Sequence, residues 1–303
     1  METYHLGLAT DCPLDDDFFS HIELVAHRKG LTTYRVHPIN LDETLVRIQS
    51  GQIKFIFYYD RASDSSTEFL DLYHILCKDQ VIHFINLEQQ GLAADKSFMH
   101  RQFILSEVSV PKTIILPEYE NQSLSHPDTL NLDFVGRPFV IKPSIHTGAG
   151  DGVMTNATVL SEIEQKRIEL PNDKYLIQEK VIPKEDEFGR YWFRVFYICG
   201  TIIQTWWNDQ THRYRSFSVE DYDLIDHAEM NNIIKKINKI CGLNFFSTEF
   251  AITEENTIVA IDYVNEICDM RLQSKFYDGV PDDVIRQIAE EIVNYFIKWV
   301  RIE

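Results

Sequence analysis

Residues 1–92 alternate between apolar runs and amphipathic segments, and this alternation limits the possible folds more than any other feature of the sequence. Strands are predicted over 4–9, 32–36, 53–59 and 81–87, with helices over about 17–29, 42–49 and 67–77 between them. The run from Ile53 to Tyr59 is almost continuously apolar, which is typical of a parallel strand covered on both faces. We therefore predict an N-terminal doubly wound α/β domain over residues 1–92.

A second block, residues 93–182, begins after Gly91, which we interpret as a change of module. Its predicted elements are a helix over 95–107, a strand over 113–116, a polar loop over 118–132, a strand–loop–strand unit over 139–154, a helix capped by Asn156 and running to Glu169, and a strand over 175–181. This mixture of strands and helices predicts a separate small subdomain.

A third block, residues 183–303, has an antiparallel pattern. Its predicted elements are a hairpin of strands over 191–199 and 201–207, a helix over 228–241 ended by Gly242, strands over 245–252 and 257–264, and a closing helix over 281–300. We interpret Trp206 and Trp207 as core residues of the hairpin and not as a platform for a sugar or base. The block is expected to be an antiparallel-sheet α+β subdomain.

Composition excludes several classes of protein. Forty-seven acidic residues against 29 basic ones give a net charge of −18, which argues against nucleic acid or an anionic membrane as the main partner. Five scattered cysteines without a C-x-x-C pair indicate neither a disulfide framework nor a zinc site. The N-terminus has no secretory pattern and no apolar run is long enough to cross a bilayer, so we expect a cytoplasmic protein.

The strand–loop–strand unit from Phe139 to Val153 carries the clearest chemistry. A lysine, Lys142, ends the first apolar run, and three glycines at alternate positions follow: Gly148, Gly150 and Gly152. Glycines let backbone amides approach an anion, and the lysine adds a point charge, which is chemistry for holding phosphates. The spacing excludes a P-loop and a dinucleotide fingerprint, and the structural alternative is a hairpin loop without a ligand.

Further polar residues occur at the ends of later predicted strands. Glu179, Lys180 and Val181 end one strand, where exposed backbone groups at a hinge suit an adenine edge. A second group, on two late strands, supplies the hard oxygen atoms that Mg²⁺ prefers: Glu249, Asp262 and Asn265. Taken singly, each of these residues is equally explained as a surface charge or a polar group at a sheet edge.

In this order and spacing, the motifs resemble those of the ATP-grasp superfamily. The corresponding strings are Val140–Pro143 with its glycine loop, Leu176–Val181, Phe193–Val195 and Val259–Asn265, and the resemblance covers nearly the whole chain. It implies an α/β protein of three-part ATP-grasp architecture, in which residues 93–182 form a lid subdomain and residues 183–303 form the metal- and substrate-binding subdomain.

The resemblance also implies roles for individual residues, with ATP and Mg²⁺ as cofactors. Lys96, Lys142 and the three glycines would contact phosphates, Glu179, Lys180 and Val181 the adenine, Asp186 or Glu187 the ribose, Arg194 the terminal phosphate, and Glu249, Asp262 and Asn265 the metal. One departure concerns that metal set, because the acid and the asparagine usually stand two positions apart. Here they stand three apart, so either a bulge realigns them or Glu266 or Asp269 takes part.

The activity that the resemblance implies is an ATP-dependent ligase that joins a carboxylate to an amine (or thiol) through an acyl phosphate. Lys142, Arg194 and Arg271 are the candidate catalytic residues, and Arg213 and Arg215 are further candidates to bind the carboxylate. The alternatives are a small-molecule kinase and a nucleotide-binding protein without turnover. The expected partners are small-molecule substrates, and a homodimer is compatible with the sequence.

Overall fold

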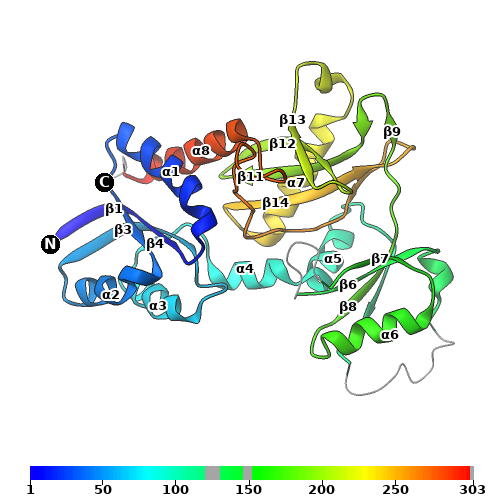
Figure 1. The fold of residues 1–303 in the computed structure, drawn as a ribbon, viewed down its shortest axis with the longest axis horizontal. Helices are drawn as coiled ribbons and strands as arrows, with labels where there is room; N and C mark the ends of the chain where they lie inside the picture. Colours follow the sequence, from blue (N-terminus) through cyan, green and yellow to red (C-terminus); the bar gives the residue numbers. More distant parts are fainter. Residues whose placement is uncertain (120–129, 146–151, 301–303) are drawn as a thin grey trace.

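A computed structural model describes residues 1–119, 130–145 and 152–300. Figure 1 shows three main sheets: a parallel sheet at the left, a small antiparallel sheet at the lower right and a larger antiparallel sheet above it. Each main sheet lies within one of the three predicted blocks, and the block boundaries at residues 92 and 182 stay predictions. None of the helices in the described residues is long and apolar enough to cross a membrane.

The N-terminal domain is the predicted doubly wound unit. Its parallel sheet has the order β2-β1-β3-β4, and the elements are β1 (Glu2–Thr10), α1 (Asp16–Arg28), β2 (Thr33–Val36), α2 (Leu41–Gln49), β3 (Ile53–Arg61), α3 (Leu70–Lys78) and β4 (Ile82–His83). β3 is covered by apolar residues in two core clusters, as its apolar sequence predicts. Phe57 packs in one of these clusters and Phe55 in the other. The predicted strand over 81–87 was wrong in length: only 82–83 pair with β3, and Asn86 then caps a helix.

Two consecutive helices, α4 (Leu87–Ala94) and α5 (Lys96–Leu105), lead out of this domain. Gly91 lies inside α4 and does not interrupt it, because a single glycine is tolerated in a helix interior; the change of module near it stays a prediction. The helices separate at Asp95, whose carboxylate accepts hydrogen bonds from the N–H groups of Ser97 and Phe98. Such a cap ends one helix and begins the next.

The middle sheet is antiparallel with the order β5-β8-β6-β7. Its elements are β5 (Thr113–Leu116), β6 (Phe139–Pro143), β7 (Met154–Ala157), α6 (Leu160–Glu169) and β8 (Tyr175–Glu179). Asn156 was predicted to cap α6, and this was wrong, because Asn156 lies within β7. The Glu162 carboxylate instead accepts hydrogen bonds from the backbone N–H groups of Thr158 and Val159. The strand expected over 175–181 ends at Glu179, and the chain then runs up to β9 at the right of Figure 1.

The C-terminal sheet is antiparallel with the order β13-β12-β11-β14-β15. Its elements are β11 (Trp192–Ile198), β12 (Thr201–Asn208), β13 (Arg213–Ser216), α7 (His227–Cys241), β14 (Phe245–Ile252), β15 (Ile258–Ala260) and α8 (Asp282–Val300), preceded by a short hairpin of β9 (Glu185–Asp186) and β10 (Gly189–Arg190). Gly242 ends α7, as predicted, and has φ 67°, the left-handed conformation that favours glycine. The last helix, α8, packs against the N-terminal domain, where Phe296 contacts Phe57 and Phe84.

Candidate functional site

The best-supported site residue is Lys142 on β6, close to where the middle sheet meets the C-terminal block. Ile141 packs against α6 on one face of the middle sheet. Because side chains alternate along a strand, the side chain of the next residue, Lys142, projects from the other face. It is 6% exposed, and its Nζ donates a hydrogen bond to the carbonyl oxygen of Ile261 at 3.0 Å and lies 5.0 Å from the centre of the Tyr263 ring. Burial lowers the pKa of Lys142 to about 8. The ammonium is thus a buried positive charge whose direct contacts among the described residues are neutral.

Hydrogen bonds tie the end of β6 to the start of α5, where Lys96 stands. The Lys96 backbone N–H donates to the Ser144 carbonyl oxygen at 3.0 Å, and the Ser144 hydroxyl donates to Asp95 at 2.6 Å. Tyr263 is fixed in the same region, because its hydroxyl accepts from Gln178 Nε2 at 2.7 Å. These contacts hold the two lysines on one rigid frame.

Arg194 and Glu249 stand opposite each other on β11 and β14, and their side chains form an ion pair. The Nε1 of Trp192 donates to a second oxygen of Glu249 at 3.0 Å. The Arg194 guanidinium lies 4.7 Å from the Trp207 ring centre, so Trp207, predicted as core, is a half-buried residue that packs on this arginine. Burial lowers the pKa of Arg194, but the charge of Glu249 outweighs it and raises the pKa above its ordinary value.

Asp262 completes the cluster of charges. Burial raises the pKa of its carboxyl group, but the positive charges of Lys96, Lys142 and Arg194 outweigh burial and lower it below its ordinary value. Three cations from α5, β6 and β11 therefore act on one carboxylate that follows β15. We call Lys96, Lys142, Arg194, Glu249 and Asp262 the charge cluster.

The chain around Asp262 departs from a regular strand. The strand predicted over 257–264 was wrong in length, because β15 ends at Ala260. Phe250 of β14 pairs with Ala260, and Ser247 pairs with Asn265. The two paired positions are three residues apart on β14 but five residues apart on the segment that follows β15, so this segment contains two extra residues. An irregularity of this kind is one of the two alternatives that the spacing of Asp262 and Asn265 left open, the other being a metal set that includes Glu266 or Asp269.

The predicted metal set stays a prediction. Its donors are two carboxylates and an amide, which suit a hard cation, and the described residues contain no group of three His, Cys, Asp or Glu side chains that could hold a metal. Of the alternatives, Glu266 is half-buried, and burial raises the pKa of its carboxyl group. Asp269 forms an ion pair with Arg271 at 2.7 Å, which occupies its carboxylate.

The predicted adenine residues lie at the end of β8 and just after it, and the predicted ribose residues lie in β9 and in the turn that follows it. Glu179 is bound to Lys112 through its backbone N–H at 2.8 Å, and Lys180 Nζ donates to Asn156. Asp186 accepts from the Tyr191 hydroxyl at 2.9 Å, whereas Glu187 is exposed at the hairpin turn. Val181 lies in the linker after β8. The adenine-binding and ribose-binding roles of these five residues stay predictions.

The glycine loop lies mostly outside the described residues, since Gly148 and Gly150 fall there. Gly152 is described, with φ 76°, just before β7. A left-handed conformation of this kind favours glycine over other residues.

The three arginines predicted to bind the substrate carboxylate contact residues outside the charge cluster. Arg271 is held by Asp269 and Asp278, at 2.7 and 2.8 Å, and these carboxylates raise its pKa. Arg215 forms two hydrogen bonds with Asp221, at 2.7 and 3.1 Å, and the exposed Arg213 lies over an aromatic ring. Binding of a substrate carboxylate by any of the three stays a prediction.

No protein-family model and no curated protein matches the sequence. Solved structures do match it along nearly its whole length. One is a RimK domain ATP-grasp protein from Sphaerobacter thermophilus, with 16% identity, 96% of this chain and 98% of that chain covered, and a TM-score of 0.65. Another is a D-alanine–D-alanine ligase from Bacillus anthracis complexed with ATP, with 11% identity, 99% of both chains covered and a TM-score of 0.67.

A third similar structure is the macrocyclase MdnC from Microcystis aeruginosa bound with the precursor peptide MdnA, with 12% identity, 96% of this chain and 99% of that chain covered, and a TM-score of 0.66. These similarities confirm the fold expected from the sequence motifs. The chain has the ATP-grasp fold.

Proposed function

We propose that this protein is an ATP-dependent ligase that joins a carboxylate to an amine (or thiol) through an acyl phosphate. The observation that carries the proposal is the charge cluster, in which the buried Lys96 and Lys142 and the half-buried Arg194, from three elements of an ATP-grasp fold, act on the carboxylate of Asp262. Structures with the same fold include a D-alanine–D-alanine ligase complexed with ATP and a D-cycloserine synthetase.

In this proposal Lys96 and Lys142 bind the phosphates of ATP. Lys142 is already desolvated, so a phosphate brought next to it gains an interaction that water weakens little. Arg194 binds the terminal phosphate and then the acyl phosphate, since a planar guanidinium pairs with two oxygens at once. The protein's contribution to phosphoryl transfer is to position the groups and to neutralise charge.

Magnesium fits the same place. Glu249, Asp262 and Asn265 would hold it, and the ion would supply positive charge that offsets the negative charge of the phosphates. The lowered pKa of Asp262 keeps this carboxylate ionised at neutral pH, as a ligand of a hard cation must be. Trp192 and Arg194 each donate to one oxygen of Glu249, so Mg²⁺ would share this carboxylate with two donors.

The remaining roles follow the sequence prediction. Backbone groups of Glu179, Lys180 and Val181 would bind adenine, and the ribose would bind Asp186 or Glu187. Glu187 is exposed, whereas Asp186 already accepts a hydrogen bond from Tyr191, which favours Glu187. The glycine loop that includes Gly152 would cover the phosphates, and Arg271 would bind the carboxylate substrate.

A hydroxamate assay tests the proposed reaction. The protein is incubated with ATP, Mg²⁺ and hydroxylamine, together with a panel of amino acids and other carboxylic acids. A ligase of this kind should form ADP and a hydroxamate with at least one acid, because hydroxylamine attacks the acyl phosphate in place of the natural amine. Lys142→Met is the control and should form neither product.

The outcome separates the proposal from its alternatives. A phosphate monoester of an alcohol, with no hydroxamate from any acid, would identify a kinase. Binding of ATP without any product would identify a nucleotide-binding protein without turnover.

A further inference from the structure

We propose that Arg61, in the N-terminal domain, is a positioning residue for the metal site of the C-terminal subdomain. The segment that it positions is residues 261–271, which we call the metal loop because it contains the four candidate ligands that follow β15: Asp262, Asn265, Glu266 and Asp269. The inference rests on the proposed function, since it concerns the site that would bind Mg²⁺ with ATP.

Arg61 is the last residue of β3 and is 5% exposed. Its Nε and Nη2 donate to the two carboxylate oxygens of Asp15 at 2.8 and 2.9 Å. Nη2 also donates to the carbonyl oxygen of Cys268 at 2.9 Å. One guanidinium thus joins the first domain to a peptide group of the metal loop, 207 residues away along the chain.

From Cys268 the contacts continue to the predicted ligands. The Cys268 Sγ donates to the carbonyl oxygen of Asn265 at 3.4 Å. The Asn265 backbone is in turn paired with Ser247 of β14, through hydrogen bonds of 2.8 and 3.0 Å. The stretch from Asn265 to Cys268 is therefore held at one end by the C-terminal sheet and at the other by Arg61.

Stability alone is a poor reason to bury this ion pair. Arg61 and Asp15 lie beside a hydrophobic cluster that contains Phe18, Cys268 and Met270, and the guanidinium is 5.7 Å from the centre of the Phe18 ring. Replacing a buried ion pair by apolar residues of similar volume is often neutral or stabilising. What apolar residues cannot reproduce is the hydrogen bond that fixes the Cys268 carbonyl.

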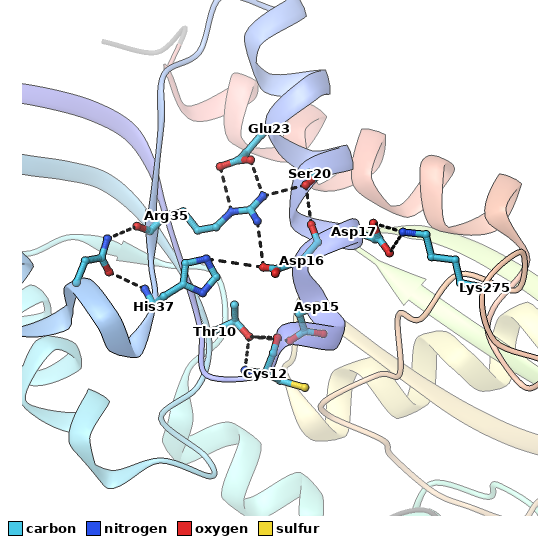
Figure 2. A network of polar contacts seen from close by, with 11 residues as sticks. Thr10, Cys12, Asp15, Asp16, Asp17, Ser20, Glu23, Arg35, His37 and Lys275 are labelled. Atoms are coloured by element: carbon cyan, nitrogen blue, oxygen red, sulfur yellow. Dashed lines mark hydrogen bonds and ion pairs between the residues drawn. The ribbon is translucent and has the colours of Figure 1, made fainter.

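Asp15 is itself held in place, because it accepts a hydrogen bond from the hydroxyl of Thr10, at the end of β1, at 3.1 Å. Figure 2 shows Thr10 and Asp15 together with Lys275, which forms an ion pair with Asp17 of α1 at 2.7 Å. The Lys275 pair links the same two parts of the chain, but it is exposed and lies outside the metal loop. It is the matched control for Arg61.

Three variants separate positioning from stability. Arg61→Lys keeps a charge beside Asp15 but loses the planar fork that reaches Asp15 and Cys268 together. The double variant Asp15→Leu/Arg61→Met removes both buried charges at once. Lys275→Ala removes only the control pair.

The first measurement is the affinity for Mn²⁺, by electron paramagnetic resonance, in the presence of saturating AMPPNP. We expect both Arg61 variants to bind Mn²⁺ about tenfold more weakly than the wild type, the size typical of residues that orient metal ligands. The double variant should keep or exceed the wild-type melting temperature, and Lys275→Ala should bind Mn²⁺ like the wild type. Unchanged Mn²⁺ affinity in both Arg61 variants would overturn the proposal.

The second measurement, hydrogen exchange of the backbone amides of residues 266–271, needs no ligand. Arg61→Lys should speed exchange there and leave the amides of β14 unchanged, and unchanged exchange in the metal loop would also overturn the proposal. If the double variant does not fold, Arg61→Lys decides alone. If the wild type binds no Mn²⁺ with AMPPNP, the proposed function is refuted. Hydrogen exchange would still test whether Arg61 positions the metal loop, because it needs no ligand.

Discussion

Replacing Lys142 with methionine should weaken ATP binding by about 10- to 100-fold, because a hydrogen bond to a charged group contributes about 1.5–3 kcal/mol. Methionine fills a similar volume, and the fold should survive the change. The pKa of Lys142 is about 8 in the folded protein and 10.5 ordinarily, so keeping this ammonium charged at pH 7 costs free energy of folding. The variant should therefore melt at the wild-type temperature or above. Calorimetric titration with ATP and a thermal melt measure the two effects.

The pKa of Lys142 also predicts how the affinity for ATP depends on pH. A bound polyphosphate favours the charged lysine, so its pKa rises on binding and the complex takes up a proton above about pH 8. Wild-type affinity for ATP should fall as pH rises from about 7 to 9.5, and Lys142→Met should lose this dependence. Equal ATP affinity in the variant and the wild type would show that Lys142 does not contact the nucleotide.

Replacing Asp262 with asparagine should raise the Mg²⁺ concentration needed for ATP binding by at least about tenfold, because a charged ligand contributes strongly to the affinity for a hard cation. It should also lower the stability at neutral pH, since Lys96, Lys142 and Arg194 lose the carboxylate that offsets them. The folded pKa of Asp262 is below its ordinary 3.8, so its stabilisation is present above that pH and is lost as the pH falls through the folded value. The stability difference should shrink in acid.

Parallel variants assign the other ligands. Asn265→Ala should raise the Mg²⁺ requirement with little effect on metal-free ATP binding, if the bulge after β15 brings this amide to the metal. An unchanged requirement in Asn265→Ala, together with a raised one in Glu266→Gln, would move the site to Glu266. The ion pair of Asp269 with Arg271 makes Asp269 the weaker alternative.

Much of the fold is readable from local sequence pattern. The apolar run that forms β3 and the left-handed Gly242 after α7 follow from the spacing of residues close in the chain. The position of Lys142 is readable for the same reason, because it ends an apolar strand before Pro143. Errors occurred where a local signal was weak, as at Asn156, which does not cap α6; the backbone N–H groups before that helix donate to Glu162 instead.

The rest depends on contacts between distant residues. The end of β15 at Ala260 is set by pairing with β14, and no pattern within residues 257–264 marks it. Asp95 joins α5 to Ser144, and Arg61 joins β3 to Cys268. Such polar contacts have no periodicity, and only the Asp95 cap before a helix offered a local signal.

Calorimetric titration of the wild-type protein with ATP tests whether the charge cluster is a site for ATP with Mg²⁺. We expect saturable binding at one site in the presence of Mg²⁺, weaker binding when EDTA removes the metal, and a melting temperature that rises with the concentration of the nucleotide. The absence of ATP binding with Mg²⁺ present would contradict this assignment.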